Sequence, residues 1–168
     1  DPLGRVTTIQ RDNFGNPTKI TKPNGAVTRM SYDLKGNLLT MIEEGTNGPG
    51  SDDQTTIFTY EPMFNQVTTI KDPNNNINPQ TGVTTKIDYD ATGNPILITD
   101  VYDTKTEHRY DEAGSGHPIV RGLLTSTIAA KNLPEENTTR FSYEPLRANL
   151  MTTTDPLSRV TRLTYDTA

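Results

Sequence analysis

The side chains of this sequence that could do chemistry are two histidines and many carboxylates. His108 and His117 lie near Asp103, Glu107 and Asp111 in the chain, and imidazole with carboxylate is a common set of metal ligands. Their spacing fits no compact metal motif, and His108 occupies an apolar position of the repeat described below. We therefore expect a packed or partly exposed His108 and no metal site.

A second candidate for metal binding is the stretch Asp-Pro-Asn-Asn-Asn at residues 72–76, which resembles the start of a calcium loop. An EF-hand needs Gly at the sharp turn and a bidentate Glu at the end of the loop. Ile77 and Val83 occupy these two positions. An EF-hand is therefore excluded, and an irregular cation site is only a minor alternative.

The acidic pairs Glu43/Glu44, Asp52/Asp53 and Glu135/Glu136 lie in polar stretches between apolar ones, where solvated charge is the simplest interpretation. Catalysis would need a pocket and a shifted pKa. The chain has no cysteine, no Gly-rich phosphate loop before a helix and no Gly-x-Ser-x-Gly motif. We expect no enzyme activity and no cofactor.

Composition indicates a β protein. Leu, Ile, Val and Phe make up 34 of the 168 residues, near the lower limit for a chain with a core, but the net charge is only −5. Threonine, with 29 copies, is β-branched and suits a half-buried strand. Basic residues are scattered among the acidic ones, so nucleic acid is not an expected partner. No apolar run approaches the roughly 20 residues that span a bilayer.

The chain repeats a short pattern that ends in an acidic residue. Six of the acidic residues follow a tyrosine, and the acidic positions are 21 to 33 residues apart. An apolar residue or His108 stands two positions before each tyrosine, and the position between them is polar, which is typical of a strand with one buried face. In three repeats a glycine follows three positions after the acidic residue. The repeat residues are Tyr32, Asp33, Gly36, Tyr60, Glu61, Tyr89, Asp90, Gly93, Tyr110, Asp111, Gly114, Tyr143, Glu144, Tyr165 and Asp166, with Asp12 as an earlier acidic position.

The acidic residue begins a turn. Asp33-Leu-Lys-Gly and Asp90-Ala-Thr-Gly suit a type I turn whose last residue has positive φ, where glycine is least strained. Glu61 and Glu144 are followed by proline, which presets φ at the second turn position. Each repeat is therefore predicted to be an antiparallel hairpin. Residues 1–168 are expected to form one array of about six hairpins, in one long, twisted and coiled sheet.

The segments 55–73, TTIFTYEPMFNQVTTIKDP, and 86–100, KIDYDATGNPILITD, closely resemble the YD repeats of Rhs proteins, and also those of Tc toxin subunits and teneurins. The resemblance covers essentially the whole chain. It implies a segment of a hollow β-shell, which in bacterial members encloses a C-terminal toxin. The implied partners are other repeats of the parent chain and the enclosed toxin domain, and the implied location is secreted or at the cell surface.

The terminal segments and the Asp-Pro pairs bear on this interpretation. Asp1–Thr7 and Asp155–Thr161 share the same repeat phase, so we expect a piece of a longer array, and the N-terminus has no signal-peptide pattern. The Asp-Pro pairs at Asp1, Asp72 and Asp155 superficially match the self-cleaving motif of Rhs shells. Each lies in a connection between hairpins, where Asp-Pro is turn chemistry.

Two alternatives to a wall-forming segment remain open. The first is a cell-surface adhesion or carbohydrate-binding region, in which the tyrosine row stacks sugars or a partner. The row is more simply a ladder that holds neighbouring strands together. The second is an enzyme of the β-solenoid or glycosidase kind, which would require two carboxylates that meet in a groove.

Overall fold

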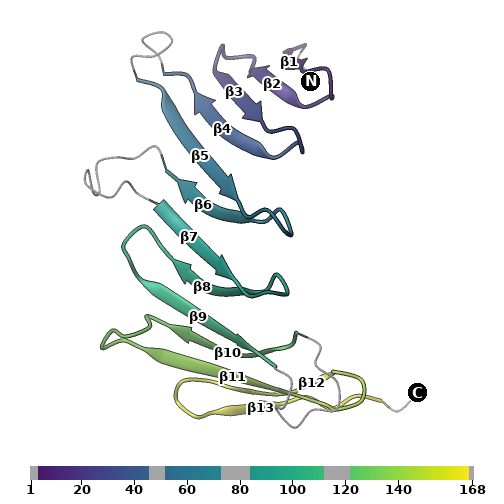
Figure 1. The fold of residues 1–168 in the computed structure, drawn as a ribbon, viewed down its shortest axis with the longest axis vertical. Coiled ribbons are helices and arrows are strands. Elements are labelled where there is room, and N and C mark those ends of the chain that lie inside the picture. The colour runs from purple at the N-terminus through teal and green to yellow at the C-terminus, as the bar shows by residue number, and fades with distance from the viewer. Residues whose placement is uncertain (1–3, 46–51, 73–83, 112–121, 167–168) are drawn as a thin grey trace. The chain divides into compact units, whose positions relative to one another are not determined.

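The computed structural model describes residues 4–45, 52–72, 84–111 and 122–166 of the chain, and all regular structure in these ranges is β-strand (Figure 1). The chain divides into two compact units, Asp1–Thr85 and Lys86–Ala168. The order of the strands in the sheet is their order in the sequence, and the paired neighbours are antiparallel. The prediction of an all-β array of antiparallel hairpins is confirmed.

Six strands precede the boundary between the units, and a seventh crosses it. The strands of the first unit are β1 (Thr8–Arg11), β2 (Pro17–Thr21), β3 (Val27–Tyr32), β4 (Leu38–Glu43), β5 (Gln54–Tyr60) and β6 (Val67–Lys71). The remaining strands are β7 (Thr84–Tyr89), β8 (Pro95–Thr99), β9 (Lys105–Tyr110), β10 (Leu124–Ala129), β11 (Asn137–Tyr143), β12 (Leu150–Thr154) and β13 (Val160–Arg162).

Each hairpin of the repeat contains a β-bulge next to its turn. In the β3–β4 hairpin, Ser31 pairs with Thr40 but Tyr32 pairs with Leu38, so Leu39 is the extra residue. The same shift occurs beside the tyrosine of β5, β7, β9 and β11. A bulge interrupts the hydrogen-bond ladder and increases the local twist. Each repeat therefore places a turn and, next to it, a bulge that interrupts the hydrogen-bond ladder.

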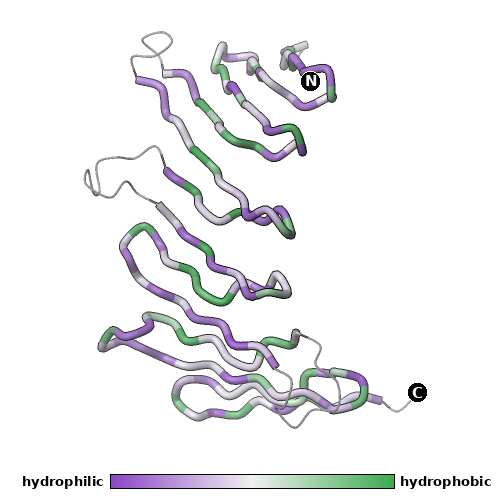
Figure 2. The backbone as a smooth tube through the Cα atoms, viewed as in Figure 1, coloured by the Kyte–Doolittle hydropathy of each residue, from purple (hydrophilic) through white to green (hydrophobic). Residues whose placement is uncertain are grey.

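The two faces of the sheet differ in chemistry. One face carries the tyrosines and apolar pairs such as Met30–Met41 and Phe58–Ile70, because residues directly opposite in antiparallel strands share a face. The other face carries hydroxyl pairs such as Ser31–Thr40, whose oxygens lie 2.5 Å apart. Figure 2 shows the longest hydrophobic stretch along β4.

No second layer covers the described strands. Only Ile128 and Asp111 are buried among the described residues, each with 5% of its surface exposed. Most strand residues are half-buried, since their neighbours along the sheet cover them only from the sides. Hydrogen bonds and lateral packing must therefore supply much of the stability, and the repeat residues are the ones that provide them.

Candidate functional site

Five tyrosines of the repeat make the same long-range hydrogen bond. Each phenolic hydroxyl donates to the main-chain carbonyl of the residue that begins the returning strand of the preceding hairpin. The pairs are Tyr32 to Pro17 (2.9 Å), Tyr60 to Leu38 (2.9 Å), Tyr110 to Pro95 (3.0 Å), Tyr143 to Leu124 (2.9 Å) and Tyr165 to Leu150 (3.0 Å). Tyr89 lies at the same repeat position, at the end of β7. The tyrosine thus joins one hairpin to the one before it.

The acceptor carbonyl lies at the bulge. Leu38, whose carbonyl receives the Tyr60 hydroxyl, is the residue at which the register between β3 and β4 shifts. Leu124 and Leu150 occupy the corresponding positions in β10 and β12. Because a bulge disrupts the ladder, a side-chain donor can satisfy a carbonyl there. Bulge and tyrosine therefore form one unit, shared between two consecutive hairpins.

The aspartates of the repeat organise the turns. Asp33 Oδ1 accepts hydrogen bonds from the backbone N–H groups of Lys35 (2.8 Å) and Asn37 (2.9 Å), while Oδ2 accepts one from the side-chain amide of Asn37 (2.8 Å). Asp12 and Asp90 hold their turns in the same way. The glycine of this turn has positive φ, 88° at Gly36, which is unstrained only without a Cβ atom.

The two glutamates serve turns that are one residue longer. The N–H of Asp33 donates to the carbonyl four residues on, whereas the N–H of Glu61 donates to Gln66, five residues on. Glu61 accepts from the N–H groups of Met63 (2.7 Å) and Phe64 (2.6 Å). Glu144 does the same with Leu146 and Arg147. One extra methylene in the side chain matches one extra residue in the turn.

Neighbouring turns also contact each other. Asn37 and Asn65, 28 residues apart in the chain, exchange two side-chain hydrogen bonds of 2.7 and 2.6 Å. Asn65 has a φ of 62°, a left-handed conformation that asparagine tolerates better than most residues. The sequence signal for this pair consists of two asparagines. Asn37 follows the glycine of one turn, and Asn65 lies within the glutamate turn of the next hairpin.

The pKa values of the acidic residues are lowered by these hydrogen bonds. At Asp90, partial burial raises the pKa, but hydrogen bonds from Thr92 and Asn94 outweigh it and lower the pKa to about 2. The pKa of Asp33 is also lowered, chiefly by the backbone and side-chain hydrogen bonds from Asn37. These carboxylates are therefore ionised near neutral pH. In this form they accept hydrogen bonds and have no proton to donate.

The pKa values of four repeat tyrosines are raised. Burial is the main cause, and the carboxylate of the preceding turn adds to it, as Asp33 does for Tyr60. The other three pairs are Asp12 with Tyr32, Asp90 with Tyr110, and Asp111 with Tyr143. Each tyrosine is thus held in its neutral, hydrogen-donating form by the hairpin that receives its hydrogen bond.

The remaining positions of the repeat are Asp111, Gly114, Tyr165 and Asp166. Asp111 is buried and accepts a 2.5 Å hydrogen bond from the N–H of Leu123. Gly114 lies outside the described residues. Tyr165 and Asp166 follow β13 and are exposed.

The metal candidates are not brought together. His108 is half-buried on the tyrosine face, with its Nδ1 3.1 Å from the hydroxyl of Thr127. Glu107 pairs with Arg109 (2.5 Å) and Lys131 (3.4 Å). His117, Ile77 and Val83 lie outside the described residues. In the ranges that the structure describes, no three His, Asp or Glu side chains form a cluster that could hold a metal ion.

The remaining candidates have structural partners. Asp155 Oδ1 accepts from the N–H groups of Leu157 and Arg159, each at 2.9 Å, so this Asp-Pro pair forms an ordinary turn. Glu44 pairs with Arg29, and Asp53 accepts from the N–H of Gly45 at 3.0 Å. Asp1 and Pro73 fall outside the described ranges. Within those ranges, no helix is long and apolar enough to cross a membrane.

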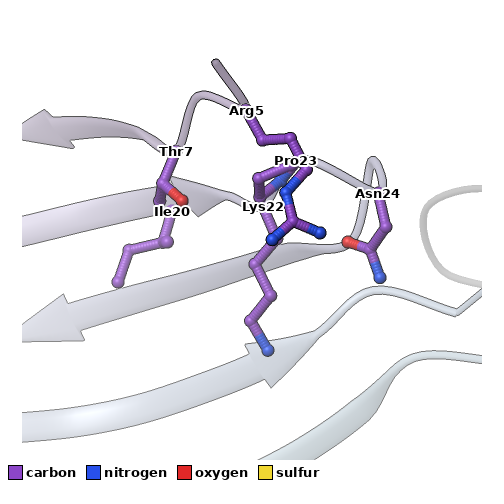
Figure 3. A pocket seen from close by; sticks show the side chains of 6 residues that line it. All are labelled: Arg5, Thr7, Ile20, Lys22, Pro23 and Asn24. Atoms are coloured by element: carbon purple, nitrogen blue, oxygen red, sulfur yellow. The ribbon is translucent and has the colours of Figure 1, made fainter. Parts of the chain in front are cut away.

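A hollow of about 700 Å³ lies beside β1 and β2 (Figure 3). Its lining residues are Arg5, Thr7, Ile20, Lys22, Pro23 and Asn24. No acid or histidine among them could act as a general base for the Thr7 hydroxyl, and the hollow is open.

Comparison with known proteins agrees with the repeat. The model of the family described as RHS Repeat matches residues 1–27 and 11–47. Together these matches cover the first 47 of the 168 residues. The matched residues contain Tyr32 and the turns of Asp12 and Asp33, and the same turn chemistry continues to Asp155. The chain is therefore built of repeats that resemble the RHS repeat. No curated protein matches the chain.

Solved structures of low identity match the chain over most of its length. The structure titled "Crystal Structure of TcdB2-TccC3-Cdc42" has 16% identity and a TM-score of 0.36, and "Crystal Structure of TcdB2-TccC3" has 17% identity and a TM-score of 0.35. Each match covers 95% of this chain and 11% of the other. The chain thus spans about a tenth of the length of these proteins.

Proposed function

We propose that these RHS repeats are a non-enzymatic part of a longer secreted or cell-surface bacterial protein, in which they contribute wall to a hollow β-shell around a C-terminal toxin. The observation that carries the proposal is the tyrosine–carbonyl bond between consecutive hairpins. This bond recurs from Tyr32 to Tyr165, and its donor and acceptor always belong to consecutive hairpins. An array built in this way can extend without a separate core.

The use of the carboxylates supports a structural role over an enzymatic one. Catalytic acids and bases need a pKa near the working pH, whereas Asp90 has a pKa of about 2 and its oxygens accept hydrogen bonds within its own turn. The tyrosines are also unsuited to stacking a sugar in the manner of exposed aromatic platforms. Except for exposed Tyr165, their rings are half-buried, and the hydroxyls of five already have a main-chain partner.

Limited proteolysis of the longer chain that carries these repeats tests the proposal. A wall-forming role predicts that the region downstream of the repeats resists protease in the intact protein. The double variant Tyr60→Phe/Tyr143→Phe should make the downstream region accessible to protease. Tyr102→Phe serves as the control, because Tyr102 lies in a turn and is 69% exposed. A downstream region cut equally fast in the wild-type protein and as an isolated domain would exclude encapsulation.

A further inference from the structure

The charged residues of this chain are sorted between strands and connections. The sequence has 16 basic and 21 acidic residues, yet basic residues dominate the strands. The nine basic residues in strands are Arg11, Lys19, Arg29, Lys71, Lys86, Lys105, Arg109, Arg140 and Arg162. The strands hold only three acidic residues, Glu43, Asp88 and Glu107. An acidic protein therefore has basic strands.

In the second unit, the basic residues of the strands share the face opposite the tyrosines. Arg109 pairs with Ser126, Ser126 with Arg140, and Arg140 with Thr154, so these four residues form a line across β9 to β12. Residues directly opposite in antiparallel strands lie on one face. Arg109 directly precedes Tyr110, and successive side chains along a strand point to opposite faces. The line therefore lies on the hydroxyl-bearing face.

Two further pairings extend this surface. Arg162 of β13 pairs with Thr152, which pairs with Ser142, two residues after Arg140 on the same face. Lys105 lies on the same face as Arg109, four residues away, and pairs with Thr99, which pairs with Lys86. We call this surface the basic face. It comprises Lys86, Lys105, Arg109, Arg140 and Arg162 with the serines and threonines between them, and it also carries Asp88, Glu107, Leu97, Ile128 and Val160.

The arginines differ in whether they have a partner. Arg109 is bonded to Glu107, which also pairs with Lys131. Arg140 and Arg162 are exposed, and neither forms an ion pair or a side-chain hydrogen bond within the described ranges. Arg109, Arg140 and Arg162 stand on alternate strands, at intervals of roughly 10 Å across the sheet. Hydroxyl groups occupy the strands between them, at Ser126 and Thr152.

This pattern indicates the chemistry of a ligand. Arginine binds carboxylate and sulfate through paired N–H donors, and the intervening hydroxyls can bond to further oxygens. On β7 to β13, the basic face has no aromatic side chain, so the base stacking on which single-stranded nucleic acid binding relies is missing. A protein partner would be expected to bury an aromatic or apolar anchor. Serine and threonine stand directly opposite Arg109, Arg140 and Arg162 in the neighbouring strands, and on β7 to β13 Val160 is the one exposed large apolar side chain of this face.

We propose that the basic face of the second unit binds an acidic polysaccharide, a chain of sugars with carboxylate or sulfate groups, laid across β9 to β13. Carboxylated and sulfated polysaccharides share this chemistry, because both carry regularly spaced oxyanions with sugar hydroxyl groups between them. Arg140 and Arg162 are the principal contacts, and Arg109 is a further one that shares its guanidinium with Glu107. This binding surface is independent of the proposed wall-forming role, since it uses the face opposite the tyrosines.

Calorimetric titration tests this site, with hyaluronan as the carboxylate probe, heparin as the sulfate probe and dextran as the neutral one. The variant Arg140→Gln/Arg162→Gln removes the two unpaired charges. Lys35→Gln/Arg147→Gln is the matched control, because it removes the same charge from exposed turn residues elsewhere. Circular dichroism should show that both variants keep the β fold, since all four side chains are exposed.

The expected result is binding of hyaluronan or heparin, but not dextran, that weakens between about 50 and 200 mM salt as counterion-dependent binding does. Arg140→Gln/Arg162→Gln should reduce the affinity by about tenfold or more, and the control should leave it unchanged. Which of the two acidic probes binds more tightly identifies the preferred oxyanion. Equal loss in both variants, no binding at low salt, or equally tight binding of single-stranded DNA or poly-glutamate would each overturn the proposal.

Discussion

The phenolic hydroxyl of Tyr60 in β5 donates a 2.9 Å hydrogen bond to the main-chain carbonyl of Leu38 in β4. The two residues belong to consecutive hairpins and are 22 positions apart. Tyr143 and Leu124 reproduce the relationship in the second unit, although 19 residues separate them. The bond therefore follows the repeat and not the distance along the chain.

Replacement of Tyr60 by phenylalanine should destabilise the chain while the ring remains in place. The lost hydrogen bond and the unsatisfied Leu38 carbonyl should cost about 1 kcal/mol. Urea unfolding followed by circular dichroism measures this change. Tyr102→Phe is the control, and it should leave the midpoint unchanged because Tyr102 is exposed in a turn. Equal midpoints for Tyr60→Phe and the wild type would show that the hydroxyl contributes nothing.

The length of each turn carboxylate should matter even when its charge is kept. Asp33→Glu puts an extra methylene into the shorter turn, and Glu61→Asp leaves the longer turn with a side chain too short to reach both backbone donors. Both variants should lower the denaturant midpoint with an unchanged m-value. The double variant should not restore stability, because each turn then has the wrong carboxylate. Tolerance of both exchanges would contradict the matching of side chain to turn.

Acid should weaken the turns. Asp90 has a pKa of about 2 in the folded chain, below the ordinary value of 3.8, so its stabilising contribution is present above about pH 4. It is lost as the pH falls from there through 2. Unfolding midpoints compared at neutral pH and near pH 2.5 measure the loss, and Asp90→Asn should show a smaller difference between the two. An identical pH dependence in that variant would assign the acid sensitivity to other groups.

Alkali should weaken the contacts between hairpins. The pKa values of Tyr32, Tyr60, Tyr110 and Tyr143 are raised in the folded chain, chiefly by burial and further by the neighbouring carboxylates. Their contribution is therefore complete below the ordinary tyrosine pKa of 10 and is lost as the pH rises through the folded values. Ultraviolet absorbance of the phenolate, compared between the wild type and the four single Tyr→Phe variants, should show these four tyrosines ionising above pH 10. Ionisation of these four at or below pH 10 would contradict the assignment.

The sequence predicts the turns and the tyrosine register because both depend on residues close together in the chain. Asp33, Gly36 and their equivalents define a local hydrogen-bond pattern, and alternation before Tyr32 defines one strand face. The acceptor of each tyrosine could not be predicted in this way. It is a carbonyl at a bulge of the previous hairpin, and its position depends on the pairing of that hairpin with the next.

The contact between Asn37 and Asn65 was missed for the same reason, since 28 residues separate the partners. The basic face, by contrast, has a signal in the sequence. A basic residue stands three positions before the tyrosine in four repeats, at Arg29, Lys86, Arg140 and Arg162. Period-2 alternation places that position on the face opposite the tyrosine.

Native-state hydrogen exchange on Tyr60→Phe tests the central claim most directly, namely that each tyrosine hydroxyl fastens its hairpin to the preceding one. Amide protection reports local opening, so a lost tie should appear where the two hairpins meet. We predict lower protection at the start of β4 and the end of β5, with no change in the turn from Asp90 to Asn94. Unchanged protection at the β4–β5 junction, or a uniform loss along the whole chain, would contradict the claim.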